Sequence, residues 1–261
     1  MSEEKENKLI LPTTKRKVKA INPQTLLIYA LPKVGKTTIC AQLENSLIIE
    51  AEFGGADFVE GCIVDVEKPS VFEEVLSSIE SSGKTYKYIV IDTLTKLDEW
   101  SEIIGTYNYM DKAQGRKFNR DEKGQVIYHT DNRFESVHEL GNGAGYQHSR
   151  NQMVAWYDRI IKLAPHIIFL AHIKDKFVES KVGDTVETLE INLTGKLKSI
   201  IPSRVDAVGY LRRKGKECFL NFDNDYKVVS GGRCPHLHGE ILISEKSDDG
   251  SIKTFWDKVY K

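Results

Sequence analysis

The sequence has few cysteines and no long apolar run. Its four cysteines, Cys40, Cys62, Cys218 and Cys234, show none of the paired spacings of a disulfide framework or a zinc site. This scarcity excludes a disulfide-stabilised scaffold and fits a reducing cytoplasm. No apolar stretch approaches the length of a membrane-spanning helix, and the first residues are charged, unlike those of a signal peptide. We therefore expect a cytoplasmic protein without a membrane partner.

The sequence also lacks an excess of charge of one sign. Its 37 lysine and arginine residues nearly cancel its 38 aspartate and glutamate residues, which leaves a formal net charge of −1. This balance gives no general attraction to nucleic acid, so any nucleic-acid surface must be local. A chain of 261 residues can form one large α/β domain or two small ones, and we expect one domain with elaborations.

Short apolar runs alternate with amphipathic stretches from residue 25 onward. We expect strands at 26–30, 46–50, 61–64, 88–92 and 167–171, and helices at 37–44, 70–82, 94–108 and 147–163. This alternation is typical of a parallel sheet covered by helices on both faces. Two later strands, 205–213 and 216–223, are expected to form a hairpin, followed by a short strand near Ile241 and a final helix around 254–260.

The remaining segments are polar and define the expected domain organisation. Residues 1–20 are expected to form a flexible N-terminal arm, 21–230 the core domain, and 231–261 a C-terminal extension. Inside the core, residues 111–145 are glycine-rich and have little periodicity, and residues 174–190 are highly charged. We expect both of these segments to be loops, and a loop as long as the first is usually functional or disordered.

The most informative stretch is ALPKVGKTT at residues 30–38, between the first expected strand and helix. A strand, a tight loop ending in Gly-Lys-Thr and a helix direct backbone N–H groups at an anion. We therefore predict a phosphate-binding loop in which Lys36 contacts the β- and γ-phosphates and the Thr37 hydroxyl helps to hold Mg²⁺. The expected nucleotide-binding residues are Ala30, Pro32, Lys33, Val34, Gly35, Lys36, Thr37 and Thr38. The full pattern has glycine at the position of Ala30, and a small side chain is a mild departure.

Polar residues also follow the other expected strands. Asp92 ends the strand in YIVIDT, where it would hold Mg²⁺ together with Thr37. Two acids, Glu50 and Glu52, lie at the end of the second strand. We predict that Glu52 orients the attacking water, and Glu50 is the alternative candidate for this role. His172 follows the fifth strand, where it would either contact the γ-phosphate or simply cap the strand end.

The order LLIYALPKVGKTT, SLIIEAEFGG, YIVIDT and HIIFLAHIKDK resembles the ATPase core of the RecA-type recombinases. More specifically, it resembles the small phage-encoded RecA-like P-loop ATPases associated with single-strand annealing and recombination. The resemblance spans residues 25–223 and implies an α/β RecA-like P-loop NTPase fold: a mainly parallel central sheet flanked by helices, here with a C-terminal β-hairpin extension. It also implies ATP and Mg²⁺ as cofactors and, for a phage protein, the host-cell cytoplasm. Glu52, Lys36 and His172 become the expected catalytic residues, with His172 replacing the glutamine switch of the bacterial recombinase.

The resemblance further implies DNA-binding loops and self-association into a ring or filament. By position the loops correspond to parts of 111–145 and 174–190, and the expected DNA contacts are Arg116, Lys117, Arg120, Lys174 and Lys176. Basic and aromatic residues in the first loop suit single-stranded nucleic acid, although interspersed acids dilute the charge. A neighbouring subunit would complete the nucleotide site with Arg212, Arg213 or Lys214, the alternative being a solvated turn. A phage single-strand-binding protein is a further expected partner.

The sequence therefore predicts a DNA-stimulated ATPase that acts on single-stranded DNA in phage recombination, repair or replication. One alternative is a nucleotide-switched DNA-binding or annealing scaffold with little turnover. Another is a P-loop kinase that acts on a small metabolite, although the sequence contains no recognisable acceptor-site motif or arginine-rich lid. Turnover measured with and without single-stranded DNA distinguishes the first two functions.

Overall fold

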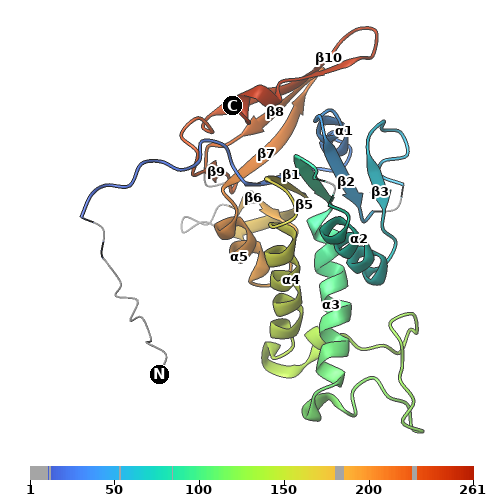
Figure 1. The fold of residues 1–261 in the computed structure, drawn as a ribbon. Helices are drawn as coiled ribbons and strands as arrows, with labels where there is room; N and C mark the ends of the chain where they lie inside the picture. Colours follow the sequence, from blue (N-terminus) through green and yellow to red (C-terminus); the bar gives the residue numbers. More distant parts are fainter. Residues whose placement is uncertain (1–10, 12, 53, 84, 180–184, 225–227) are drawn as a thin grey trace, which may run out of the picture.

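The structure is a computed structural model that describes residues 11, 13–52, 54–83, 85–179, 185–224 and 228–261 (Figure 1). For residues 175–179 and 185–188 only the backbone is described. The predicted mainly parallel sheet is present, with strand order β11-β10-β8-β7-β1-β5-β4-β2-β3. Six consecutive strands of this order are parallel to one another: β7, β1, β5, β4, β2 and β3. Beyond β7, the antiparallel strands β8, β10 and β11 extend one edge of the sheet.

The parallel part of the sheet is built from β1 (Thr25–Ala30), β2 (Ser46–Glu50), β3 (Ile63–Asp65), β4 (Tyr88–Asp92) and β5 (His166–Glu179). Every residue of β1, β2 and β4 is buried, which explains why these strands are continuous apolar runs in the sequence. Alternate residues of β1 enter different cores: Leu27 and Tyr29 pack on one face of the sheet, and Leu26 and Ile28 on the other.

Helices cover both faces of this sheet. They are α1 (Lys36–Ala41), α2 (Pro69–Ser81), α3 (Leu94–Met110), α4 (Tyr146–Ile160) and α5 (Leu197–Arg204). On one face, Phe72 of α2 packs edge-on against Trp156 of α4, with ring centroids 5.5 Å apart, and also contacts Trp100 of α3. On the other face, Trp256 donates a hydrogen bond from its indole to the carbonyl of Ile39 in α1 at 2.8 Å. The C-terminal segment is therefore part of the second core.

Helices α3 and α4 form an arm that extends beyond the sheet (Figure 1). Gly105 lets them approach closely, because a Cβ there would lie 2.6 Å from the backbone nitrogen of Ser149. The connection 111–145 lies at the far end of the arm, well away from α1 (Figure 1). It contains three short 3-10 turns: η1 (Ala113–Gly115), η2 (Val137–Glu139) and η3 (Gly141–Gly143).

The prediction of a loop at 174–190 is wrong. Strand β5 continues to Glu179 and pairs antiparallel with β6 (Thr185–Ile191), with Ile173 opposite Ile191. The segment TVETLEI contains five β-branched or apolar residues and two glutamates, a composition that favours a strand although the charge suggests a loop. Helix α5 was also not predicted, since it is short and contains Pro202.

The C-terminal strands include the predicted hairpin of β7 (Ala207–Lys214) and β8 (Glu217–Asn221). They continue through β9 (Gly231–Gly232), β10 (Glu240–Lys246) and β11 (Ile252–Thr254). The predicted final helix around 254–260 is reduced to one 3-10 turn, η4 (Trp256–Lys258), because residues up to Thr254 pair with β10 instead. Within the described part of the chain, no helix is both long enough and apolar enough to cross a bilayer.

Candidate nucleotide-binding site

The loop between β1 and α1 has the geometry of a phosphate-binding loop. Strand β1 ends at Ala30, α1 begins at Lys36, and Gly35 has a φ of 108°, a conformation that strongly favours glycine. The first helical hydrogen bond runs from the backbone N–H of Ile39 to the carbonyl of Gly35 at 3.1 Å. The loop therefore delivers Lys36 and Thr37 at the helix N-terminus, as the motif predicts.

Lys36 is buried at the centre of the site. Its ammonium donates to the carbonyl of Leu31 at 3.4 Å and lies 3.5 Å from Nδ1 of His172. Burial lowers the pKa of Lys36, while the carboxylates of Asp92 and Glu52 oppose this shift. Lys36 therefore places a positive charge beside the helix N-terminus, where a phosphate group would bind.

Thr37 and Asp92 meet beside Lys36. The Thr37 hydroxyl donates to Oδ2 of Asp92 at 2.5 Å. Burial raises the pKa of Asp92, and the hydrogen bond from Thr37 acts in the opposite direction. A hydroxyl and a buried carboxylate are hard oxygen donors of the kind that Mg²⁺ prefers, so these two residues fit the predicted ion.

Glu52 lies just past the end of β2 and faces the same site. Its Oε1 accepts hydrogen bonds from the Thr93 hydroxyl and from Nε2 of His172, both at 2.7 Å. Burial would raise the pKa of Glu52, but the hydrogen bonds from His172 and Thr93 and the charge of Lys36 outweigh it and lower the pKa. Glu52 is therefore held as a carboxylate.

Glu50, the alternative candidate for the catalytic carboxylate, does not contact Lys36. It is buried, and its Oε1 accepts a hydrogen bond from the backbone N–H of Ala56 at 2.8 Å. A Cβ at Gly55 would lie 2.5 Å from that same oxygen, so the carboxyl packs under the loop that follows β2. Burial raises the pKa of Glu50. Of the two acids, only Glu52 hydrogen-bonds to His172.

His172 is placed by the pairing of β5 with β1, which sets it opposite Ala30. Its backbone N–H donates to the Thr95 hydroxyl at 3.1 Å, and its carbonyl accepts from the backbone N–H of Asn192 at 2.9 Å. The sequence analysis did not single out Thr93, Thr95 or Asn192. Thr93 and Thr95 could have been predicted from the sequence, since polar residues within three positions of Asp92 lie at the same edge of the sheet.

Residues 22–234 match the family described as AAA domain. The chain belongs to this family. It is a nucleotide-binding P-loop domain of the ATPase type. The predicted α/β fold, a mainly parallel central sheet flanked by helices with a C-terminal β-hairpin, is confirmed.

The matches to solved structures include two proteins of low sequence identity. The RadB recombinase is 10% identical with a TM-score of 0.43, and the match covers 90% of this chain and 92% of that one. A KaiC-like protein from the hyperthermophilic archaeon Pyrococcus horikoshii OT3 is 12% identical with a TM-score of 0.41, and the match covers 92% and 99% of the two chains. No curated protein matched the sequence.

Arg213 contacts the phosphate loop of its own AAA domain. Its guanidinium Nη2 donates to the carbonyl of Val34 at 2.8 Å, and a Cβ at Gly35 would lie 2.9 Å from the same nitrogen. The other two candidates for a residue acting on a neighbour both bond to Glu240 of β10: Arg212 at 2.5 Å and Lys214 at 3.3 Å. Arg213 therefore contacts its own phosphate loop, whereas Arg212 and Lys214 contact β10.

The expected DNA contacts of the AAA domain fall in two separate regions. Arg116, Lys117 and Arg120 belong to the connection at the far end of the arm (Figure 1). The Arg120 guanidinium donates to the backbone carbonyls of Arg116 and Gly124 at 2.9 Å and 3.0 Å. Lys174 is exposed on β5 two residues after His172, and the side chain of Lys176 lies outside the described residues.

Proposed function

We propose that the protein is a RecA-like ATPase that acts on single-stranded DNA in phage recombination, repair or replication. The observation that carries the ATPase part is the hydrogen-bonded chain from Lys36 through His172 to Glu52, next to the pair of Thr37 and Asp92. Phosphoryl transfer needs positioning and electrostatic stabilisation rather than elaborate covalent chemistry. These five side chains supply both.

Each residue has a role that follows from its contacts. Lys36 and the loop amides bind the phosphates of ATP, and the Glu52 carboxylate orients a water molecule by accepting its proton in a hydrogen bond. Thr37 and Asp92 would hold Mg²⁺, which supplies positive charge to the phosphate oxygens. The lowered pKa of Glu52 keeps this group ionised near neutral pH, so its oxygens can accept a hydrogen bond from the water molecule.

His172 is proposed to report the state of the γ-phosphate. Its ring contacts Lys36 and Glu52, while its backbone carbonyl accepts a hydrogen bond from Asn192, directly after β6. A movement of the His172 ring would therefore displace the paired strands β5 and β6. These strands carry Lys174 and Lys176, two of the expected DNA contacts. We further propose that subunits assemble into a ring or filament and that a phage single-strand-binding protein is a partner. Of the three basic candidates for the junction between subunits, we propose that Arg212 or Lys214 contributes there, because Arg213 bonds to its own phosphate loop.

The test is an ATPase assay with Mg²⁺, with and without a single-stranded oligonucleotide, with assembly size followed by light scattering. Wild-type protein should hydrolyse ATP faster with DNA. Lys36→Ala should lose ATP binding and turnover but keep its circular dichroism spectrum, because the side chain it removes serves phosphate binding. Unchanged turnover in Lys36→Ala would refute the site. If DNA alters neither turnover nor assembly, the DNA part of the proposal fails, and nucleotide-dependent DNA binding without turnover would favour the scaffold alternative.

A further inference from the structure

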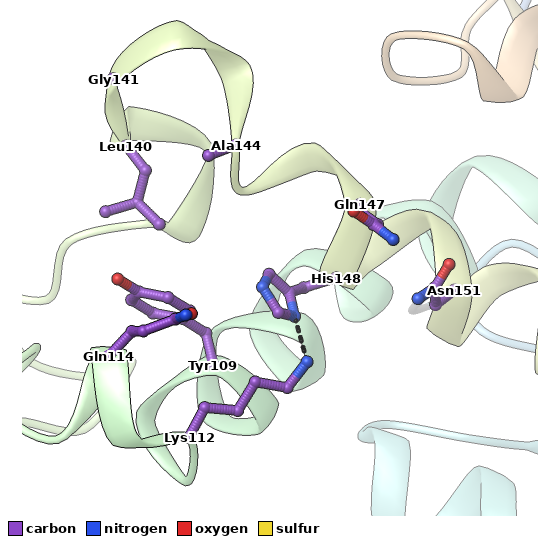
Figure 2. Close-up of a pocket in the computed structure, with 9 residues that line it drawn as sticks. All are labelled: Tyr109, Lys112, Gln114, Leu140, Gly141, Ala144, Gln147, His148 and Asn151. Carbon is purple, nitrogen blue, oxygen red and sulfur yellow. Dashed lines mark hydrogen bonds between the residues drawn. The ribbon is translucent and has the colours of Figure 1, made fainter.

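We infer that the far end of the arm carries a groove that binds unpaired nucleotides of a single strand, through residues of α3, α4 and the start of the connection between them that were not predicted from the sequence. The tip groove has a volume of about 530 Å³, and its polar lining consists of Tyr109, Lys112, Gln114, Gln147, His148 and Asn151 (Figure 2). This inference rests on the proposed action on single-stranded DNA and names a site for it.

The tip groove is formed by closely packed elements. A Cβ at Gly145 would overlap the carbonyl of Val137, and one at Gly115 would overlap the carbonyl of Tyr109. Behind the groove, the ring of His138 stacks on Tyr146 with centroids 4.2 Å apart. The two glycines thus hold the turns of the connection against the helices, and the groove has a defined shape.

A second hollow continues the groove along the helices. It has a volume of about 460 Å³ and shares Lys112, His148 and Asn151 with the first. Asn108 and Gln152 line its other side, together with the single acid Asp111. Two adjoining hollows around shared polar residues suit consecutive units of a chain-like ligand better than one compact molecule.

Lys112 supplies the positive charge of the tip groove. Its ammonium donates to Nδ1 of His148 at 3.5 Å, and Figure 2 shows the two side chains pointing toward each other. Burial, followed by the charge of Lys112, lowers the pKa of His148, so this imidazole is neutral near pH 7. The pair thus presents one cation, which matches one phosphate of a nucleic-acid backbone.

The other side chains suit nucleobases. Carboxamides both donate and accept, and they make paired hydrogen bonds with base edges. Gln114, Gln147 and Asn151 line the first hollow, and Figure 2 shows Leu140 across that hollow from Tyr109 and Gln114. The Tyr109 ring is supported by Phe118, with centroids 5.5 Å apart. A supported aromatic ring beside several carboxamides favours an unstacked base, which only a single strand or loop exposes.

The experiment measures fluorescence anisotropy of a fluorescein-labelled single-stranded DNA oligonucleotide. We expect Lys112→Gln to weaken binding about tenfold and to reduce the salt dependence of binding by about one released counterion. Asn151→Ala should weaken binding by a similar factor with no change in salt dependence, because its contact is with a base. Lys123→Gln is the matched control: Lys123 is an exposed lysine of the same connection that lines neither hollow, so its removal should leave affinity nearly unchanged.

The outcomes distinguish this inference from the proposed function. If wild-type protein does not bind the oligonucleotide, the proposed action on DNA fails, and the inference fails with it. If wild-type protein binds but both groove variants bind equally well, the groove is not the site and the proposed function stands. The same conclusion follows if only Arg116→Gln and Lys117→Gln lose affinity. Unchanged binding of a fluorescent ATP analogue and an unchanged melting temperature confirm that each variant is folded. Gln147→Ala, at another exposed position, serves as a third groove variant.

Discussion

Nε2 of His172 lies 2.7 Å from Oε1 of Glu52, although the two residues are 120 positions apart in the chain. Nδ1 of the same ring lies 3.5 Å from the ammonium of Lys36. An ammonium can only donate, so Nδ1 accepts from Lys36 and the Nε2–H of His172 donates to Glu52. One imidazole therefore connects the phosphate-binding lysine to the proposed catalytic carboxylate.

This connection predicts different outcomes for two substitutions at His172. His172→Ala removes the donor that orients Glu52, so we expect turnover to fall about ten- to a hundredfold and stimulation by DNA to disappear. His172→Gln retains a side-chain N–H and should keep part of both properties. ATPase rates with and without single-stranded DNA measure this. Equal rates in wild type and His172→Ala would show that the residue only caps its strand.

Glu52 and Glu50 should respond differently to the same conservative change. Glu52→Gln should lower turnover by about 10²- to 10⁴-fold while leaving ATP binding intact, because general-base groups contribute on this scale. Glu50→Gln should keep most of the turnover, since that carboxyl bonds to Ala56 rather than to His172. Single-turnover hydrolysis and binding of a fluorescent ATP analogue separate the two effects. The opposite pattern would return the catalytic role to Glu50.

The lowered pKa of Glu52 predicts a dependence of stability on pH. Its pKa in the folded protein lies below the usual value of 4.5, so the ionised carboxylate stabilises the folded state. This contribution is fully present above pH 4.5 and is lost as the pH falls through the lower, folded-state value. Urea unfolding of wild type and Glu52→Gln should therefore differ in free energy at pH 7, and the difference should shrink in acid. A difference that grows on acidification would contradict the assignment.

Thr37 offers a test of the proposed magnesium site. Thr37→Val keeps the shape of the side chain but removes the hydroxyl that bonds to Asp92, so the Mg²⁺ concentration needed for half-maximal turnover should rise at least about tenfold. Thr37→Ser keeps the hydroxyl and should behave much like wild type. Titration of turnover against Mg²⁺ gives the comparison. The same Mg²⁺ requirement in both variants would exclude Thr37 as a ligand.

Mixing two inactive variants tests whether Arg213 acts within its own subunit or on a neighbour. Arg213 bonds to its own loop, so we expect mixtures of Arg213→Ala and Lys36→Ala to stay inactive. If Arg213 completed a neighbour's site, a Lys36→Ala subunit would supply the missing arginine and mixing would restore turnover. Arg212→Ala and Lys214→Ala, mixed with Lys36→Ala in the same way, test the two candidates whose side chains bond to Glu240 instead. Recovery of turnover in one of these mixtures would assign that residue to the junction between subunits.

The sequence predicted best those elements whose pattern is local. Strands 46–50 and 88–92 were predicted with the boundaries that the structure shows, because continuous apolar runs bounded by polar residues leave few alternatives. The pairing of β5 with β6 was missed, since the charged residues of both strands suggested a loop. The tip groove was missed because it depends on the contact between α3 and α4, which are separated by the connection 111–145.

The sequence alone determined the phosphate-binding loop, because the glycine at 35, the lysine at 36 and the threonine at 37 act through neighbouring backbone atoms. It also indicated that Asp92, Glu52 and His172 lie at strand ends, which parallel strands bring to one edge of a sheet. Only the tertiary structure decided which of these side chains contact each other. It turned Glu50 under its own loop, directed Glu52 to His172, and placed Arg213 against Val34, because strand register and the path of each loop fix these contacts.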